Sequence, residues 1–359
     1  MPVVRSVGVN FKEAIGLIGP ASRANYDKAM ERQAILTKPA GALGFLEDIA
    51  GKYSAISPEF PPRVPVQPVV CIFASDHGVL EEGITPWPQE VTTQMVANFL
   101  EGGAAINAIA KQIGARVSVV DIGVAGDTSG FAGILSRKVR AGTDNLARRP
   151  AMTVAEAEEA VQVGFDVAND LIDQGCDILL IGDMGIGNTT PSAALISWFA
   201  KSDVEETTGR GTGIGDDHMV VKIKAIKSAH SRLQDEAASS PLEVLASIGG
   251  LEIAGMAGLI LAASARRIPV VLDGVIADAA AVVSYELSEH VKDYIFAGHL
   301  SQEPGARKAL DYIGLKPVLL LDLRLGEGTG ACLSVPIIQS AVRTLVEMAT
   351  FDSASVSKA

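Results

Sequence analysis

Short apolar runs alternate with longer amphipathic stretches along the chain, and this alternation limits its fold more than any other feature. Helical spacing of apolar residues fills the intervals, as in Val91–Ile113, Thr153–Gln174 and Asp216–Glu236. Short buried strands that alternate with helices predict βα units and a mostly parallel sheet. The predicted strands are Val66–Ala74, Arg116–Val120, Asp177–Ile181, Pro269–Leu272, Tyr294–Ala297 and Pro317–Leu323.

The number of strands separates two architectures. Six strands favour an open, doubly wound α/β sheet, whereas a closed parallel barrel needs eight. A barrel stays open as an alternative, because short strands are easily missed. Residues 1–60 precede the first strong strand and have helical spacing over Ala21–Gln33 and Ala42–Tyr53, which is consistent with a smaller helical subdomain.

Composition limits the class of protein. Apolar residues make up 48% of the 359 residues and the mean hydropathy is +0.29, which predicts a large core. The net charge of −12 argues against a nucleic-acid or anionic-membrane partner. Any phosphate-bearing ligand must therefore be held by local donors.

No segment indicates a membrane or secreted protein. The longest apolar stretch, Ile253–Ala265, is too short to cross a bilayer and predicts a buried helix. The first residues lack the apolar segment of a signal peptide. Cys71, Cys176 and Cys332 are widely spaced and form no CxxC, so we expect reduced thiols and a cytoplasmic protein.

Glycines and polar residues follow every predicted strand. In doubly wound sheets, ligands bind beyond the carboxyl ends of the strands. We therefore expect these clusters to converge on one cleft. They are Ser75–Gly78, Asp121–Gly126, Gly182–Thr190, Asp273–Gly274, Gly298–Glu303 and Gly326–Gly330.

Glu327 is the first candidate for catalysis. It lies between Gly326 and Gly328, in the turn from the last predicted strand to a helix that begins near Ala331. Glycines allow the backbone to approach a ligand and to adopt positive φ. A solvated loop acid is the alternative, but the convergence of the other turns favours a functional carboxylate.

Two glycine-rich loops are candidates for phosphate binding. The backbone amides of Gly185–Thr190 and the start of the following helix can form a phosphate cradle. Neither a Walker A lysine nor a dinucleotide fingerprint is present. The second loop, Thr208–Gly215, precedes a helix with Lys222, so Arg210 or Lys222 can neutralise a phosphate. A tight turn and a mobile loop with a solvated basic helix are the structural alternatives.

The sequence gives little support for a metal site or for a serine hydrolase. The histidines, including His77 and His299, have no HxxxH or HxH spacing, and no cysteine lies at ligand spacing from them. A serine hydrolase would need a GxSxG elbow, which is absent. Trp87, between two prolines, can line a flat aromatic pocket or serve only loop packing.

The motifs in these turns, taken in order, resemble those of the nicotinate-nucleotide–dimethylbenzimidazole phosphoribosyltransferases. The similarity extends from about residue 30 to residue 350. It rests on LTKPAGALGFLE at Leu36–Glu47, SDHG at Ser75–Gly78, VTTQMV at Val91–Val96, GDMGIGNTTPSAA from Gly182, TGRGTG from Thr208, LDG at Leu272–Gly274, GHLSQEPG from Gly298 and RLGEGTGA from Arg324.

The resemblance implies a homodimer whose chains combine a large α/β domain with a small domain of terminal helices. On this basis we predict a catalytic domain at residues 61–334 and a small helical domain at residues 1–60 plus about 335–359. It implies transfer of ribose 5-phosphate from nicotinate mononucleotide to 5,6-dimethylbenzimidazole, giving α-ribazole 5′-phosphate and nicotinate in cobalamin lower-ligand synthesis. No cofactor is expected.

The resemblance also implies roles for residues. Glu327 is the general base, and Asp183 is a second catalytic carboxylate. The phosphate and ribose are assigned to Gly185, Gly187, Asn188, Thr189, Lys222, Arg210 and Ser301. The acceptor base is assigned to Asp76, His77, Thr85, Trp87, Gln94, Met184 and Leu325.

Two positions depart from the family pattern. Asp183 stands where the family usually has Glu, and Ala306 stands where it often has His. A shorter carboxylate and a lost polar contact affect acceptor preference more than reaction class.

The residues agree with the chemistry. Nicotinate leaves as a pyridine and needs no proton, whereas an attacking benzimidazole must lose its N–H proton. One base, a phosphate cradle and a flat apolar pocket are sufficient without a metal. A Rossmann-type oxidoreductase, a non-catalytic nucleotide-binding protein and a magnesium-dependent phosphoribosyltransferase are the alternatives. The first lacks its fingerprint, and the third lacks a visible paired-acid loop.

Overall fold

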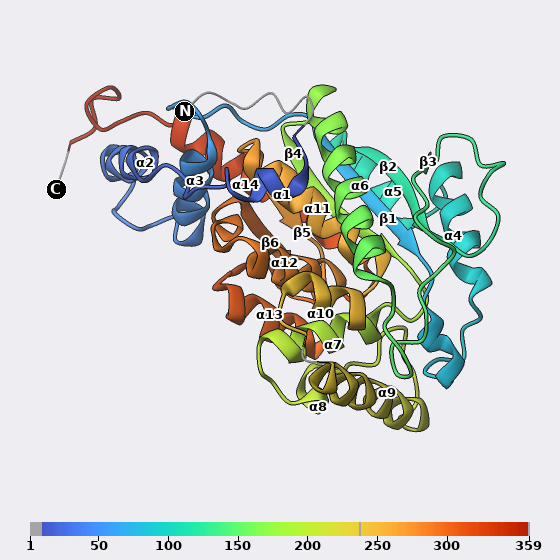
Figure 1. Cartoon of the computed structure of the whole chain (residues 1–359). Helices are drawn as coiled ribbons and strands as arrows, with labels where there is room; N and C mark the ends of the chain where they lie inside the picture. Colours follow the sequence, from blue (N-terminus) through green and yellow to red (C-terminus); the bar gives the residue numbers. More distant parts are fainter. Residues whose placement is uncertain (1–8, 237, 358–359) are drawn as a thin grey trace.

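A parallel seven-stranded sheet lies at the centre of the protein (Figure 1). The computed structural model describes residues 9–236 and 238–357. The strand order is β3-β2-β1-β4-β5-β6-β7. The strands are β1 Pro68–Ser75, β2 Arg116–Gly123, β3 Leu135–Ser136, β4 Ile178–Met184, β5 Val270–Leu272, β6 Ile295–His299 and β7 Pro317–Leu319.

This order confirms the predicted doubly wound α/β class. From β1 the chain extends the sheet through β2 and β3 on one side and through β4 to β7 on the other. The topological switch point therefore lies between β1 and β4, where such sheets bind ligands at their carboxyl edge. The prediction missed only β3, which has two residues and is too short to show a periodic pattern.

Helices cover both faces of the sheet. α11 and α12 pack on one face, α5 and α14 pack on the other, and α6 packs against α11. The helices are α1 Phe11–Ile15, α2 Arg23–Ile35, α3 Phe45–Ile56, η1 Gly78–Glu82, α4 Glu90–Glu101, α5 Ala105–Ile113, α6 Val154–Asp173, α7 Thr189–Phe199, α8 Val204–Thr207, α9 Asp216–Asp235, α10 Pro241–Ile248, α11 Leu251–Ala265, α12 Val275–Leu287, η2 Glu289–Tyr294, α13 Pro304–Ile313 and α14 Thr329–Glu347.

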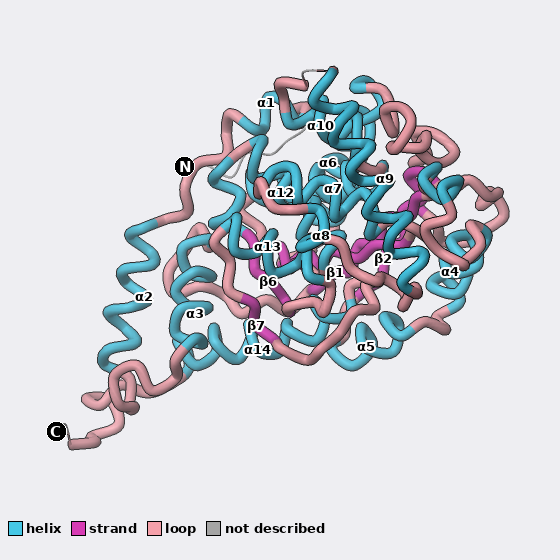
Figure 2. The backbone as a smooth tube through the Cα atoms, turned by 90° about the horizontal axis from the view of Figure 1, so that it is seen from below, coloured by secondary structure: helices cyan, strands magenta, loops and turns pink. Residues whose placement is uncertain are grey.

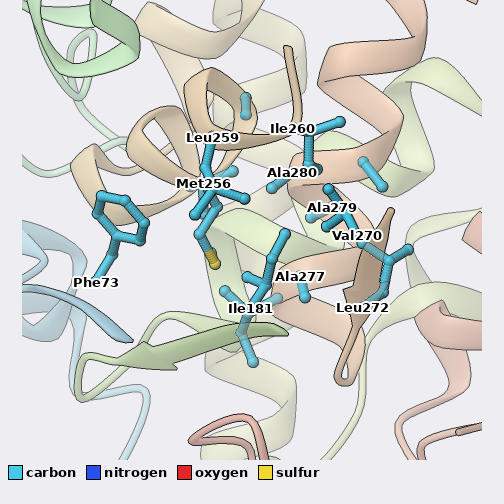
Figure 3. Close-up of a cluster of buried hydrophobic side chains, with 14 of the residues drawn as sticks. Phe73, Ile181, Met256, Leu259, Ile260, Val270, Leu272, Ala277, Ala279 and Ala280 are labelled. Atoms are coloured by element: carbon cyan, nitrogen blue, oxygen red, sulfur yellow. The ribbon is translucent and has the colours of Figure 1, made fainter. Parts of the chain in front are cut away.

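The core lies between the middle strands and the helices α11 and α12. Figure 3 shows Phe73, Ile181 and Val270 of the sheet facing Met256 and Ile260 of α11, with alanines of α12 beside them. The apolar residues of α11 surround the whole helix, and nearly all of its residues are buried. This burial explains why the apolar stretch needs no bilayer.

Two predicted elements differ from the structure. The single helix expected over Val91–Ile113 is two helices, α4 and α5, because Gly102 ends α4 in the left-handed region with φ 81°. The run Pro317–Leu323 is not one buried strand. Only Pro317–Leu319 forms β7, at the edge of the sheet, and Leu320 and Leu321 are 69% and 51% exposed.

The terminal segments pack together, and α2 and the C-terminal residues project from the body (Figure 2). Leu36 forms a bridge with Thr350, and Arg32 donates to the carbonyls of Leu345 and Val346 at the end of α14. α14 is long and apolar enough to cross a membrane, but more than half of it is buried, as in core helices of globular proteins. The division into two domains stays a prediction.

Candidate active site

Glu327 lies at the carboxyl edge of the sheet in a strained turn. Its φ is 65°, between Gly326 and Gly328 with φ 87° and 91°. Left-handed backbone costs energy in a residue with a Cβ, so the surroundings must impose it. The carboxyl group is 6% exposed, and Oε2 has no hydrogen-bond partner among the described residues. Burial raises the pKa of Glu327, although the backbone N–H of Ile106 at the start of α5 opposes the shift.

Asp273, directly after β5, holds this turn in place. Its carboxylate accepts hydrogen bonds from the backbone N–H groups of Gly328 at 3.0 Å, Gly330 at 2.6 Å and Ala331 at 3.1 Å. The first N–H groups of a helix have no partner within it, so Asp273 caps α14 from another element. Burial raises the pKa of Asp273 to about 7 despite these bonds.

Asp183 occupies the end of β4, beside the Glu327 turn. A Cβ added at Gly326 would lie 3.3 Å from its Oδ1, so the two elements are in contact. Its Oδ2 accepts from the Asn188 amide at 2.9 Å. Burial and the neighbouring carboxylates, Asp273 first, raise the pKa of Asp183 to about 8. This shift favours the protonated form of Asp183 near neutral pH.

Asp76 and His77 follow β1, across the switch point, and are 1% exposed each. Asp76 Oδ2 accepts from the Ala125 N–H at 2.7 Å. His77 Nε2 lies 3.0 Å from Oε1 of the fully buried Glu252, at the start of α11. Burial alone would lower the pKa of His77, but Glu252 and Asp76 raise it. His77 thus lies behind the β4 turn, paired with a carboxylate.

The turn after β4 forms a pocket for a phosphate-sized group together with the loop before α9. The pocket is lined by Gly185–Thr190, Arg210–Thr212 and Lys222. Lys222 is 2% exposed, and its Nζ donates to Thr189 Oγ1 at 2.7 Å and to the Gly209 carbonyl at 2.9 Å. Burial lowers the pKa of Lys222 to about 8, and the charge of Glu303 opposes this. A cation and helix N-terminal amides thus converge on one cavity.

Arg210 and Ser301 are the remaining candidates for binding the phosphate and the ribose. Arg210 lines the pocket, but its guanidinium pairs with Asp216 at 2.6 Å. Ser301 is buried, and its hydroxyl accepts from the Glu303 N–H at 3.3 Å. A Cβ added at Gly274 would lie 3.5 Å from the Ser301 hydroxyl, which places this serine beside the loop after β5.

The acceptor candidates divide into two sets. Thr85 lines the pocket and Met184 is partly buried at the end of β4. Trp87 is 49% exposed, Leu325 is 56% exposed and Gln94 is exposed on α4. The structure therefore brings the first two to the cleft and leaves the other three on the surface around it.

Ala306 is fully buried near the start of α13. The effect of this departure from the family pattern on acceptor preference stays a prediction.

Several residues that build the site were not predicted to belong to it. Asp273 and Glu303 lay inside recognised turns without an assigned role, and Glu252 was only the polar end of an apolar helix. Thr92 accepts from the Ile186 N–H at 3.1 Å, and with Gln89 it counteracts the rise of the Asp76 pKa. Only Glu252 had a signal in the sequence, because it is a charged residue at the start of an otherwise apolar helix.

The arrangement has two chemically different halves. One half is a phosphate-sized pocket with a buried lysine, and the other is a set of buried carboxylates without cationic partners sufficient to balance them. Such a site holds a phosphorylated substrate at one end and stabilises or removes positive charge at the other. In a doubly wound fold, this combination defines an enzyme that acts on a phosphorylated sugar or nucleotide.

Comparison with known proteins agrees with this class. The phosphoribosyltransferase family model matches residues 18–356. The nicotinate-nucleotide–dimethylbenzimidazole phosphoribosyltransferase of Desulforudis audaxviator is 49% identical over 349 residues, which cover 97% of this chain and 98% of the relative. The enzyme of that name from Salinispora tropica is 48% identical over 355 residues, covering 95% and 97%.

Solved structures give the same result. CobT from Thermus thermophilus superposes with a TM-score of 0.89 at 45% identity, covering 94% of this chain and all of that one. The chain belongs to the nicotinate-nucleotide–dimethylbenzimidazole phosphoribosyltransferase family. The predicted family and enzyme class are confirmed, and the oxidoreductase alternative is set aside. The roles of individual residues stay predictions.

Binding of ribose 5-phosphate is expected to weaken as the pH rises through about 8, because Lys222 loses the proton that attracts the phosphate. Calorimetric titrations between pH 7 and 9.5 measure this dependence. Lys222→Ala should bind weakly at every pH and lose the dependence, whereas Lys224→Ala, exposed on the same helix, should behave as wild type. Asp183 also titrates near 8, so a dependence that disappears in Asp183→Asn and persists in Lys222→Ala would contradict the assignment.

Proposed function

We propose that the protein transfers the 5-phosphoribosyl group of nicotinate mononucleotide to 5,6-dimethylbenzimidazole or a related azole. The products are α-ribazole 5′-phosphate, used in cobalamin lower-ligand synthesis, and nicotinate. Nearly full-length relatives with this name support the substrates. The observation that carries the proposal is the buried carboxylate of Glu327, whose Oε2 has no partner among the described residues, at the same sheet edge as the phosphate pocket.

The reaction breaks one C–N bond and forms another at C1 of the ribose. The bond to the nicotinate nitrogen breaks with its electron pair, and the departing ring becomes a neutral pyridine. A ring nitrogen of the azole attacks the same carbon, which makes the azole cationic until its other nitrogen loses a proton. We assign that proton to Glu327, whose raised pKa makes it a stronger base than an exposed glutamate.

The proposed role of Asp183 is to stabilise the positive charge of the substrate. Nicotinate mononucleotide carries a cationic ring nitrogen, and positive charge spreads over the ribose as the bond breaks. A nearby cation favours the ionised form of a carboxyl group. We propose that Asp183, whose raised pKa favours the protonated form, ionises when the nucleotide binds and then stabilises the developing charge.

The phosphate half anchors the nucleotide. Lys222, the amides after Gly185 and the start of α7 are proposed to bind the 5′-phosphate. Thr85 and Met184 are proposed to flank the acceptor ring, with Leu325 and Trp87 at the mouth. Binding energy at the phosphate then fixes the ribose relative to the carboxylates. This positioning lowers the barrier of the transfer step.

Buried, unpaired cysteines are consistent with the proposed cytoplasmic location. Cys71, Cys176 and Cys332 are all free and buried in the structure.

Replacing Glu327 with Gln is expected to lower turnover by about 10²–10⁴-fold, because the amide keeps the shape but cannot accept the azole proton. Product formation from nicotinate mononucleotide and dimethylbenzimidazole can be followed by chromatography with mass detection. Calorimetry should show wild-type binding of the nucleotide, and Asp183→Asn should lose less activity. Near-normal turnover of Glu327→Gln would transfer the role of base to Asp183. A wild-type protein that binds the nucleotide but does not turn it over would favour a non-catalytic binding protein.

Turnover is expected to persist in EDTA, because the leaving pyridine needs no Lewis acid. Within residues 9–236 and 238–357, no group of three or more His, Cys, Asp or Glu side chains has metal-binding geometry. Initial rates with and without a chelator measure the effect. Complete loss of activity that a divalent cation restores would refute metal independence.

A homodimer is expected to form through the apolar edge beyond β7, where Leu320, Leu321 and Leu325 are more than half exposed. Exposed apolar residues that lie close together commonly mark an interface. Light scattering after size exclusion should give twice the chain mass of 37.3 kDa. Leu320→Asp with Leu321→Asp should shift the protein toward monomer, whereas Leu17→Asp, at another exposed leucine, should not. A monomeric wild type at micromolar concentration would refute this assembly.

A further inference from the structure

Gly211, in the glycine-rich loop over the phosphate pocket, is held through both its N–H and its carbonyl. Its N–H donates to Glu303 Oε1 at 2.8 Å. Its carbonyl accepts from the Arg324 guanidinium at 3.2 Å. Lys222 Nζ holds the same loop two residues earlier, through the Gly209 carbonyl at 2.9 Å. Three side chains that are far apart in the sequence thus fix one short loop.

The Glu303 carboxylate is tightly packed against the loop at Gly209. Glu303 is 7% exposed, and a Cβ added at Gly209 would lie 2.1 Å from its Oε2. No side chain other than hydrogen can occupy that place without displacing the carboxylate. A Cβ added at Gly211 would lie 3.0 Å from Thr189 Oγ1, at the start of α7. The loop is therefore packed against both Glu303 and the phosphate pocket.

The two side chains that hold Gly211 come from neighbouring strand ends. Glu303 follows β6, immediately before α13, and Arg324 follows β7, three residues before Glu327. The loop that lines the phosphate pocket is thereby tied to the segment that carries the proposed base. This connection is not needed for packing of the hydrophobic core, since Arg324 is exposed.

We propose that Glu303 is a positioning residue that fixes Gly211 over the phosphate pocket through its N–H, and that Arg324 joins the carbonyl of the same residue to the turn of Glu327. The inference rests on the proposed function. Glu303 makes no bond of the reaction. It sets where the loop amides and Lys222 meet the nucleotide phosphate, and through Arg324 it relates that phosphate to the base.

Glu303 has a second, electrostatic effect. Lys222 is buried, and Glu303 is the charged neighbour that opposes the fall of its pKa. Arg210, on the same loop, pairs with Asp216, and Arg324 contacts Gly211 from the solvent side. Removing the negative charge of Glu303 should therefore lower the pKa of Lys222 below about 8.

Glu303→Ala and Glu303→Gln separate the two effects. At pH 6.5, where Lys222 is charged, Glu303→Ala should raise KM for nicotinate mononucleotide about tenfold, as for loss of a charge-assisted hydrogen bond. KM for the azole should change less than about twofold. Glu303→Gln keeps an acceptor for the Gly211 N–H, so its KM at pH 6.5 should stay near wild type, while the alkaline limb of kcat/KM moves to lower pH. Glu206→Gln, which removes an exposed pair with Lys308, is the matched control and should change neither.

Trypsin cleavage after Arg210 gives a readout that does not need activity. Glu303→Ala should be cleaved there faster than wild type, and Glu206→Gln should not. If the wild type does not turn over the substrates, the proposed function fails, and this cleavage still decides whether Glu303 holds the loop. Because Glu303 and Arg324 hold the two backbone groups of one residue, Gly211, the loss in kcat/KM of the Glu303→Ala, Arg324→Ala double variant should be smaller than the product of the single losses.

Three results would overturn the proposal. The first is a Glu303→Ala enzyme with wild-type KM and unchanged cleavage after Arg210. The second is an equal rise of both KM values together with a lower melting temperature, which would show a general structural role. The third is independent, multiplicative losses in the double variant.

Discussion

The capping of α14 by Asp273 is the interaction on which the site depends. A helix N-terminus exposes several N–H groups, and here three of them bind one carboxylate supplied by a different strand. This contact fixes the direction in which α14 leaves the sheet. Glu327, directly before the capped residues, has a left-handed backbone with φ 65°. The proposed general base, with an oxygen that has no partner among the described residues, thus lies directly before residues that this cap holds in place.

Burial raises the pKa of every one of these carboxyl groups, and neighbouring carboxylates add to the shift at Asp183 and Asp273. Asp183 and Asp273 have pKa values near neutrality, and Asp76 and Glu327 are shifted in the same direction. Buried carboxylates of this kind are costly while unpaired. A cationic ligand lowers that cost when it binds, so the site is matched to a pyridinium nucleotide and to positive charge that develops on ribose. The phosphate pocket, with its lysine and amides, has the opposite preference, and we propose that the two halves together orient a substrate that carries both charges.

The switch point explains why these groups meet. β1 and β4 are neighbours in the sheet but are separated in sequence by β2, β3 and α6. Their carboxyl ends bring Asp76 and His77 next to Asp183 and the phosphate turn. Helices that follow adjacent parallel strands point their N-termini toward the same edge, so amides and caps gather where the side chains already lie.

Sequence alone determined the fold class and the edge that holds the site, since both follow from local patterns. Apolar periodicity marked the strands, and Gly185–Thr190 and Gly326–Gly330 marked turns where a backbone must approach a ligand. Motif order identified the family. Only the tertiary structure showed that Asp273 caps α14, that Glu252 pairs with His77, and that Glu303 holds Gly211. It also showed that Leu320, Leu321, Trp87 and Gln94 are exposed. These facts depend on contacts between residues distant in the chain and on burial, which no local window of sequence contains.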